Sequence, residues 1–246
     1  MADLESNRVS GHYDDHLGPV YSWIAGGVEN ATLRGAAELD AIPVPPNGMA
    51  VDLGAGFGMH SLPLADRGYR VLAIDSCASL LEELSTHGGD RILTVCDDLL
   101  SFPRHLPEDF EATLVLCMGD TLTHLPDRPA VSRLISSSAS ILRPGGLLVL
   151  SFRDYSTELV GDRRFIPVRS DGDRILTCFL EDREDHILVH DLLHQRDSSS
   201  WKFEVGSYRK LRLSPEWVLA ELEENGFSVR REAGLSGMVR LVATLC

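Results

Sequence analysis

Between residues 49 and 152 the chain repeats one pattern: a short, continuously apolar segment, then a longer segment with apolar residues at helical spacing. Strands that are apolar without alternation are typical of a parallel sheet covered on both faces. Their alternation with helices predicts a doubly wound α/β fold. The expected strands are 49–53, 70–75, 92–96, 112–118 and 147–152, and the expected helices are 59–66, 77–86 and 129–142.

After Arg153 the pattern changes to apolar segments separated by polar turns such as SDGD and RDSSS. This predicts an inserted antiparallel sheet. Ser214 and Pro215 then suit the cap and first position of a helix, which Gly226 ends. The strands expected in the insert are 175–180, 187–194 and 202–213, and the two expected after the helix are 228–232 and 238–245.

The segment before the first apolar strand has a different organisation. Residues 13–39 show helical spacing, interrupted at Gly26 and Gly27, whereas residues 40–48 (DAIPVPPNG) contain three prolines and cannot be regular structure. The chain therefore divides into three expected parts: an N-terminal helical cover (1–48), an α/β core (49–155 and 214–246) and the inserted sheet (156–213).

A glycine-rich loop follows the first expected strand, in the sequence VDLGAGFG over residues 51–58. Glycines at 54, 56 and 58 remove the side chains that would block the approach of a ligand to the backbone. The spacing is GxGxG, and Met59 stands where a dinucleotide fingerprint has glycine or alanine. A nucleoside ligand fits this loop better than a pyrophosphate, although a plain turn is the simpler alternative.

Acidic residues end the next two expected strands. Asp75 lies 21 residues after Gly54 and can accept two hydrogen bonds from a ribose diol. Asp97 and Asp98 end the third strand, where a carboxylate suits an adenine amino group. For Asp75 or Asp97 taken alone, a helix cap is the favoured interpretation. Together, at successive strand ends, they indicate an adenosine-bearing ligand.

These motifs resemble the class I S-adenosylmethionine-dependent methyltransferases. The resemblance is carried by VDLGAGFG (51–58), VLAID (71–75), VCDDL (95–99) and ILRPGGLLVL (141–150). It implies a seven-stranded, mostly parallel sheet whose last strand is antiparallel, with S-adenosylmethionine as cofactor and S-adenosylhomocysteine as product. The cofactor-binding residues it implies are Tyr21, Asp52, Gly54, Ala55, Gly56, Asp75, Ser76, Asp97, Asp98, Leu99 and Met118.

Two further segments, CMGDTLTHLPD (117–127) and SFRDY (151–155), look like the corresponding stretches of glycine N-methyltransferases. That resemblance implies that the loop after the fourth strand contacts cofactor and substrate. It also implies that Arg153 holds a substrate carboxylate, with Tyr155 beside it. Asp120 stands where that family has a neutral amide, so the identity of the substrate is left open.

The catalytic candidates are therefore Asp120, His124, Arg153 and Tyr155. Asp120 can accept a hydrogen bond from a substrate amine or hydroxyl, or cap the following turn. His124 can take a proton, hold the cofactor carboxylate, or be a buried, hydrogen-bonded histidine. Arg153 can pair with a carboxylate or with neighbouring Asp154.

Aromatic residues near the N-terminus and histidines in the insert have more than one interpretation. Tyr13, Tyr21 and Trp23 can cover the cofactor or simply pack a helix. His186, His190 and His194 recur every four residues, but on a strand such positions lie about 13 Å apart, too far to share one ion. We therefore expect no metal site.

Charge and composition limit the kinds of binding partner and the location that the sequence predicts. The chain has 23 Lys and Arg against 37 Asp and Glu, a net charge of −14, which disfavours nucleic acid. No apolar run approaches the roughly 20 residues that span a bilayer, and the acidic N-terminus is unlike a signal peptide. Five scattered cysteines favour a reducing cytoplasm.

The sequence thus predicts a monomeric or homodimeric cytoplasmic enzyme that methylates a small molecule, at an amine of a carboxylate-bearing metabolite. O-methylation of a small hydroxylated metabolite is one alternative. An NAD-dependent oxidoreductase that uses Gly54, Gly56 and Asp75 is another, and a cofactor-binding protein without turnover is a third.

Overall fold

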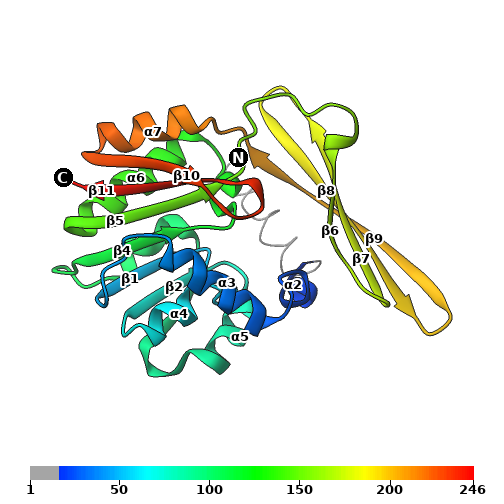
Figure 1. Ribbon diagram of the computed structural model, residues 1–246, viewed down its shortest axis with the longest axis horizontal. Coiled ribbons are helices and arrows are strands. Elements are labelled where there is room, and N and C mark those ends of the chain that lie inside the picture. Colours follow the sequence, from blue (N-terminus) through cyan, green and yellow to red (C-terminus); the bar gives the residue numbers. More distant parts are fainter. Residues whose placement is uncertain (1–16) are drawn as a thin grey trace.

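The computed structural model describes residues 17–246, which form two sheets of different construction (Figure 1). The larger sheet has seven strands in the order β10-β11-β5-β4-β1-β2-β3. Pairing is parallel among β1 to β5, and β11 is antiparallel to both of its neighbours. This confirms the expected seven-stranded, mostly parallel fold. The strands are β1 (Met49–Leu53), β2 (Arg70–Asp75), β3 (Ile92–Cys96), β4 (Ala112–Cys117), β5 (Leu142–Phe152), β10 (Phe227–Ala233) and β11 (Val239–Leu245).

Helices cover both faces of the larger sheet, which explains its continuously apolar central strands. All six residues of β4 are buried, as are four of the five in β1. One apolar cluster joins one face of the sheet to the helix before β5 and the helix before β10, and a second joins the opposite face to the helices near the N-terminal strands. The helices are α3 (Val28–Asp40), α4 (Ser61–Asp66), α5 (Ala78–Gly88), α6 (Arg128–Ile141) and α7 (Pro215–Glu224).

The smaller sheet has four antiparallel strands in the order β6-β7-β8-β9. It lies beside the carboxyl ends of the parallel strands of the larger sheet (Figure 1). In β8 every second residue from Ile187 to Leu193 is buried, so one face packs inward, against helix α2 (Gly18–Ile24) among other elements. Its strands are β6 (Phe165–Ser170), β7 (Arg174–Asp182), β8 (His186–Asp197) and β9 (Ser200–Leu211).

The sequence predicted only three of these four strands, because β6 contains Pro167 and has no buried residue. Proline is tolerated there because β6 is an edge strand, and the pairing with β7 shifts register between Pro167 and Arg169. Strand β5 was also expected to begin at residue 147. It begins at Leu142, since Ala112 pairs with Leu142 ahead of a register shift.

All strands of the larger sheet lie within 49–155 and 214–246, and all strands of the smaller sheet lie within 156–213. Of the expected helical cover, the structure describes α2 and α3, whereas Tyr13 lies outside the described residues. No helix from residue 17 onward is long and apolar enough to cross a membrane.

Helix α7 returns the chain from the smaller sheet to the larger one and begins as the sequence predicts. The Ser214 hydroxyl accepts a hydrogen bond from the Trp217 amide at 3.2 Å, and Pro215 occupies the first helical position. Because this cap satisfies an amide that would otherwise lack a partner, we expect Ser214→Ala to lower the free energy of unfolding by about 1 kcal/mol.

Urea unfolding measures this effect. Ser136→Ala is the matched control, because Ser136 is exposed on helix α6 and caps nothing. A change within about 0.5 kcal/mol is expected for the control. Equal losses in the two variants would remove Ser214 from its capping role.

Candidate active site

A cavity of about 670 Å³ lies where the carboxyl ends of β1 to β4 face the smaller sheet. Its size is within the roughly 300–1,000 Å³ of small-molecule sites. One wall consists of loops after the parallel strands, and the other includes residues of β8 and β9. From the core and α2 the lining includes Tyr21, Gly54, Ala55, Gly56, Asp75, Ser76, Asp97, Asp98, Leu99, Met118, Gly119 and His124, and from the smaller sheet His186, Leu188, Ser207, Tyr208, Arg209 and Lys210.

The glycine loop presents bare backbone to this cavity. Gly54 has φ of +77°, and a Cβ there would lie 2.4 Å from Cγ2 of Thr121. Gly56 has φ of +53°, and a Cβ there would meet nothing closer than 3.9 Å, on Leu80 and Tyr21. Gly54 is therefore required by the close approach of the loop after β4, whereas Gly56 leaves open space on the cavity side.

Asp75 joins the glycine loop to the end of β2. Its Oδ2 accepts the Gly56 amide at 2.8 Å, and its Oδ1 accepts the Cys77 amide at 2.9 Å. Burial raises the pKa of Asp75, against the lowering effect of these two amides. Each carboxylate oxygen has a second lone pair, so both can also accept a hydroxyl from a diol in the cavity.

The two acidic residues after β3, Asp97 and Asp98, make different contacts. Asp97 Oδ2 lies 2.7 Å from Nε2 of His105, a contact that lowers the pKa of Asp97. Asp98 Oδ1 accepts the Leu100 amide and caps the 3-10 helix η3 (Leu99–His105). Asp98, and not Asp97, is therefore the cap of this helix, and the Asp97 carboxylate lies beside the cavity.

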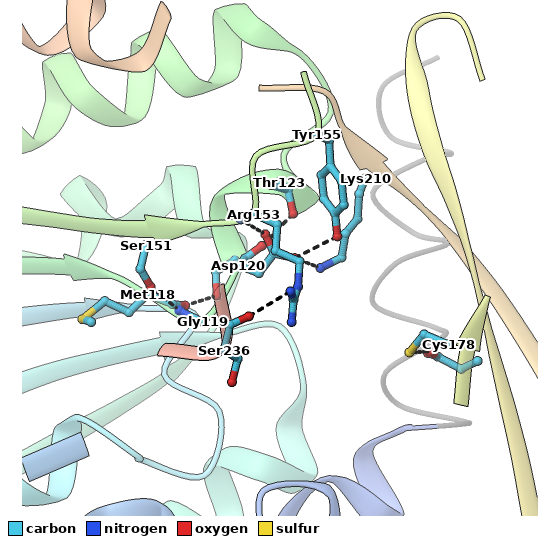
Figure 2. A network of polar contacts seen from close by, with 12 residues as sticks. Met118, Gly119, Asp120, Thr123, Ser151, Arg153, Tyr155, Cys178, Lys210 and Ser236 are labelled. Atoms are coloured by element: carbon cyan, nitrogen blue, oxygen red, sulfur yellow. Dashed lines mark hydrogen bonds and ion pairs between the residues drawn. The ribbon is translucent and has the colours of Figure 1, made fainter. Parts of the chain in front are cut away.

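A buried polar cluster stands at the boundary between the two sheets (Figure 2). Its centre is Asp120, which is 5% exposed and has φ of +73° after the tip of β4. The Arg153 amide donates to Asp120 Oδ1 at 2.8 Å, and the Tyr155 hydroxyl lies 3.5 Å from Oδ2. The ammonium of Lys210, from β9, forms an ion pair with the same Oδ2.

The charge of Asp120 depends on this pairing. Burial alone would raise the pKa of Asp120, but the positive charge of Lys210 and the Arg153 amide outweigh it and hold the pKa below its usual value. Asp120 is therefore ionised, with its carboxylate engaged by three donors. The ion pair ties the smaller sheet to the core.

The structure brings most of the predicted cofactor residues to one cavity but leaves four predicted site residues outside its lining. Asp52 is buried below the loop and accepts the Ser61 hydroxyl at 2.6 Å, and burial raises its pKa. Asp120 and Tyr155 lie in the cluster described above. The Arg153 guanidinium donates to the Ser236 carbonyl oxygen at 3.1 Å, away from the lining residues.

His124, in the 3-10 helix η4 (Thr121–His124), does line the cavity. Its ring stacks on Tyr208 of β9, with ring centroids 5.2 Å apart. Trp23 is directed elsewhere, since its indole N–H donates to Asp171. The histidines of the insert lie on strand β8, as predicted: His190 contacts Glu181, and His194 stacks on Phe203.

Lys210 also lines the cavity, and the sequence did not predict it. The sequence contains a pattern that could have indicated Lys210. In β9, Tyr208 and Lys210 are two positions apart, so they share the buried face of an alternating strand. A lysine on that face predicts a buried cation with a carboxylate partner. The partner, however, is 90 residues away, and spacing along the chain does not identify it.

A family model described as a methyltransferase domain matches residues 50–146. The glycine/sarcosine N-methyltransferase of Aphanothece halophytica is 30% identical over 118 residues, which cover 47% of this chain and 43% of that enzyme. The ubiquinone biosynthesis O-methyltransferase of Xylella fastidiosa (strain 9a5c) is 30% identical over 174 residues, covering 65% of this chain and 67% of that enzyme. The chain thus spans less than half the length of the glycine-methylating relative.

Solved structures share the complete fold. Streptomyces venezuelae DesVI has a TM-score of 0.77 at 16% identity, covering 95% of this chain and all of that one. CalS10 of Micromonospora echinaspora, an amino pentose methyltransferase with bound S-adenosylmethionine, has a TM-score of 0.75 at 16% identity, covering 94% and 97%. The chain belongs to the class I S-adenosylmethionine-dependent methyltransferases, whose cofactor is S-adenosylmethionine.

The lowered pKa of Asp120 makes part of the stability dependent on pH. Its ionised form contributes stability that is present above the ordinary Asp pKa and is lost as pH falls through the lower folded value. We expect Asp120→Asn to be about 3 kcal/mol less stable than wild type near about pH 6, with the difference shrinking toward about pH 3.

Urea unfolding over a pH series measures this difference. Asp109→Asn, at an exposed loop position, is the control and should match wild type throughout. A gap between Asp120→Asn and wild type that stays constant with pH would show that the Asp120 charge does not stabilise the fold.

Proposed function

We propose that the protein transfers the methyl group of S-adenosylmethionine to the amine of a small, carboxylate-bearing metabolite. The observation that carries the proposal is the single cavity that joins the glycine loop and Asp75 to a second wall from the smaller sheet, where Lys210 lies. One half of this cavity suits an adenosyl group, and the other leaves room for a small acceptor.

In our proposal the cofactor half of the cavity holds S-adenosylmethionine. Gly54 and Gly56 would lie against its methionine part, because both line the cavity and the space beside Gly56 is open. Asp75 would hold the ribose hydroxyls through its remaining lone pairs. Asp97 and Leu99 would border the adenine. In our proposal the remaining predicted contacts come from Tyr21, Ala55, Ser76, Asp98 and Met118, which line the same cavity, with Asp52 supporting the loop from below.

The sulfonium of the cofactor, when bound, supplies a methyl group already activated for in-line displacement. The chain has to hold the acceptor in line and exclude water, and orientation of this kind lowers a barrier by roughly 7–11 kcal/mol. An amine must reach the site without its extra proton, and His124 is the lining residue we propose to accept it. Its ring is held in place by the stack on Tyr208.

Amine methylation is supported by the similarity to glycine/sarcosine N-methyltransferases. O-methylation of a hydroxylated metabolite is a second candidate, favoured by the ubiquinone biosynthesis relative, which covers more of this chain. Family membership favours S-adenosylmethionine over the nicotinamide dinucleotide that the glycine spacing left open.

The partners we propose follow from charge. A net charge of −14 favours a small molecule over nucleic acid as substrate. A cytoplasmic location and a monomeric or homodimeric state stay predictions from the sequence.

Asp75→Ala is expected to weaken S-adenosylmethionine binding more than tenfold, because it removes the proposed acceptor for two ribose hydroxyls. Isothermal titration of wild type and variant with S-adenosylmethionine, S-adenosylhomocysteine and NAD measures the loss. Asp109→Ala, at an exposed position remote in sequence, is the control and should bind as wild type does. Unchanged affinity in Asp75→Ala would remove Asp75 from the ribose site.

A methyl-uptake panel tests the activity itself. Wild-type protein with S-adenosylmethionine labelled in the methyl group is incubated with amino acids, simple amines and catechols, and labelled products are separated. We expect label in amino acids and not in catechols. Label found only in catechols would favour O-methylation, and none in any acceptor, with the cofactor bound, would favour a binding protein without turnover.

A further inference from the structure

The substrate half of the cavity contains a cation that no sequence motif indicates. Lys210 is 8% exposed, lines the cavity and projects from the buried face of β9. Its Nζ lies between Asp120 on the core side and the ring of Tyr208, 5.9 Å from the ring centroid. Tyr208 and its stacking partner His124 both line the cavity, so the ammonium stands at the wall that faces the acceptor.

The hydrogen-bonding capacity of this ammonium is not used up. A lysine ammonium has three N–H donors. Among residues 17–246, Asp120 Oδ2 is its only hydrogen-bond acceptor. Two donors on a cation that is nine-tenths buried are therefore available to oxygen atoms in the cavity, and leaving such donors unpaired is costly. A carboxylate matches them in charge and in number of oxygens.

The carboxylate of Asp120, in contrast, already accepts three donors and does not line the cavity. It receives the Arg153 amide, the Tyr155 hydroxyl and Lys210. Its lowered pKa makes it a weak base for a substrate proton. Asp120 therefore acts on the cavity through Lys210, as a positioning residue that holds the ammonium at one place on the wall.

The other cations near the cavity are less suited to this role. The Arg153 guanidinium is engaged with the Ser236 carbonyl oxygen, and Arg153 does not line the cavity. Arg209 does line it, but its side chain is 39% exposed and pairs with Asp185 at 3.0 Å. A buried cation attracts an anion more strongly than an exposed one, because solvent screens it less.

The distribution of charge along the cavity also favours one orientation of the bound acceptor. Carboxylates of Asp75 and Asp97 stand at the cofactor end and repel an anionic group, whereas Lys210 stands at the smaller-sheet end. An acceptor with an amine and a carboxylate would place its carboxylate toward Lys210. Its amine would then point toward the cofactor end of the cavity.

The geometry points to Lys210, held by Asp120, as the site that binds the carboxylate of the substrate, in place of the Arg153 expected from the family resemblance. This inference rests on the proposed function, since it names the substrate class as amino acids or similar amines that carry one carboxylate. It assigns specificity to the smaller sheet, with the cofactor held by the core.

The test compares matched acceptors and matched variants. Methyl uptake is measured for common amino acids, each beside its carboxamide, which removes the negative charge while keeping the amine. Wild type should favour the carboxylate form by at least about tenfold in kcat/KM. Lys210→Met should remove this preference, mostly through KM for the carboxylate form, and should leave the amide rates and the S-adenosylmethionine affinity within about threefold of wild type.

Three further variants make the result interpretable. Lys202→Met removes an exposed lysine of the same strand and should behave as wild type. Arg153→Ala should keep the carboxylate preference. Since Lys210→Met leaves Asp120 buried without its counter-ion and can fail to fold, the double variant Asp120→Asn with Lys210→Met removes both charges, and it should fold yet lack the preference.

A binding measurement separates this inference from the proposed activity. Protein loaded with S-adenosylhomocysteine is titrated with acetate, and with acetamide as the neutral isostere, and followed by NMR. Acetate should bind wild type more than about tenfold tighter than acetamide and should lose this advantage in Lys210→Met.

Each outcome decides one of the two proposals. Lys210-dependent acetate binding without methyl uptake from any amine would keep the carboxylate site and overturn amine methylation. Methyl uptake by amines without preference for the carboxylate form would keep amine methylation and overturn the carboxylate site. Loss of the carboxylate preference in Arg153→Ala but not in Lys210→Met would overturn the inference in favour of Arg153. If the protein shows neither acetate binding nor methyl uptake, both proposals are overturned.

Discussion

Parallel pairing of β1 with β2 and β4 is the constraint on which the rest of the site depends. Because Leu53 pairs with Ile74 and Asp75 pairs with Cys96, the chain leaves each of these strands at the same edge of the sheet. The glycine loop and Asp75 meet there for that reason alone. The hydrogen bond from the Gly56 amide to Asp75 is a direct consequence of the register.

The smaller sheet completes the site through the ion pair of Lys210 with Asp120, and burying this pair costs free energy. Two charges lose their hydration when Asp120 and Lys210 pair between β4 and β9, and the attraction between them offsets this only because their positions are well defined. The Arg153 amide and the Tyr155 hydroxyl help define the position of Asp120. An arrangement this specific favours one docking position of the smaller sheet over others.

Several elements could be predicted because local sequence controls them. Strands β1, β2 and β3 have the predicted bounds, since each is a short apolar segment between turns. Helix α7 begins at the predicted cap. Strand β6 escaped prediction, because an edge strand with Pro167 and without buried residues lacks the apolar pattern that marks a strand.

The sequence by itself determined the α/β core, the glycine loop and the line of acidic strand ends, because these depend on residue type and spacing within short segments. Only the tertiary structure decided which residues face the acceptor: it placed Arg153 away from the cavity lining and brought Lys210 to the wall. The physical reason is that Asp120 and Lys210 are 90 residues apart and meet only when the smaller sheet packs beside the core. Contacts between distant segments leave no periodic signal in the chain.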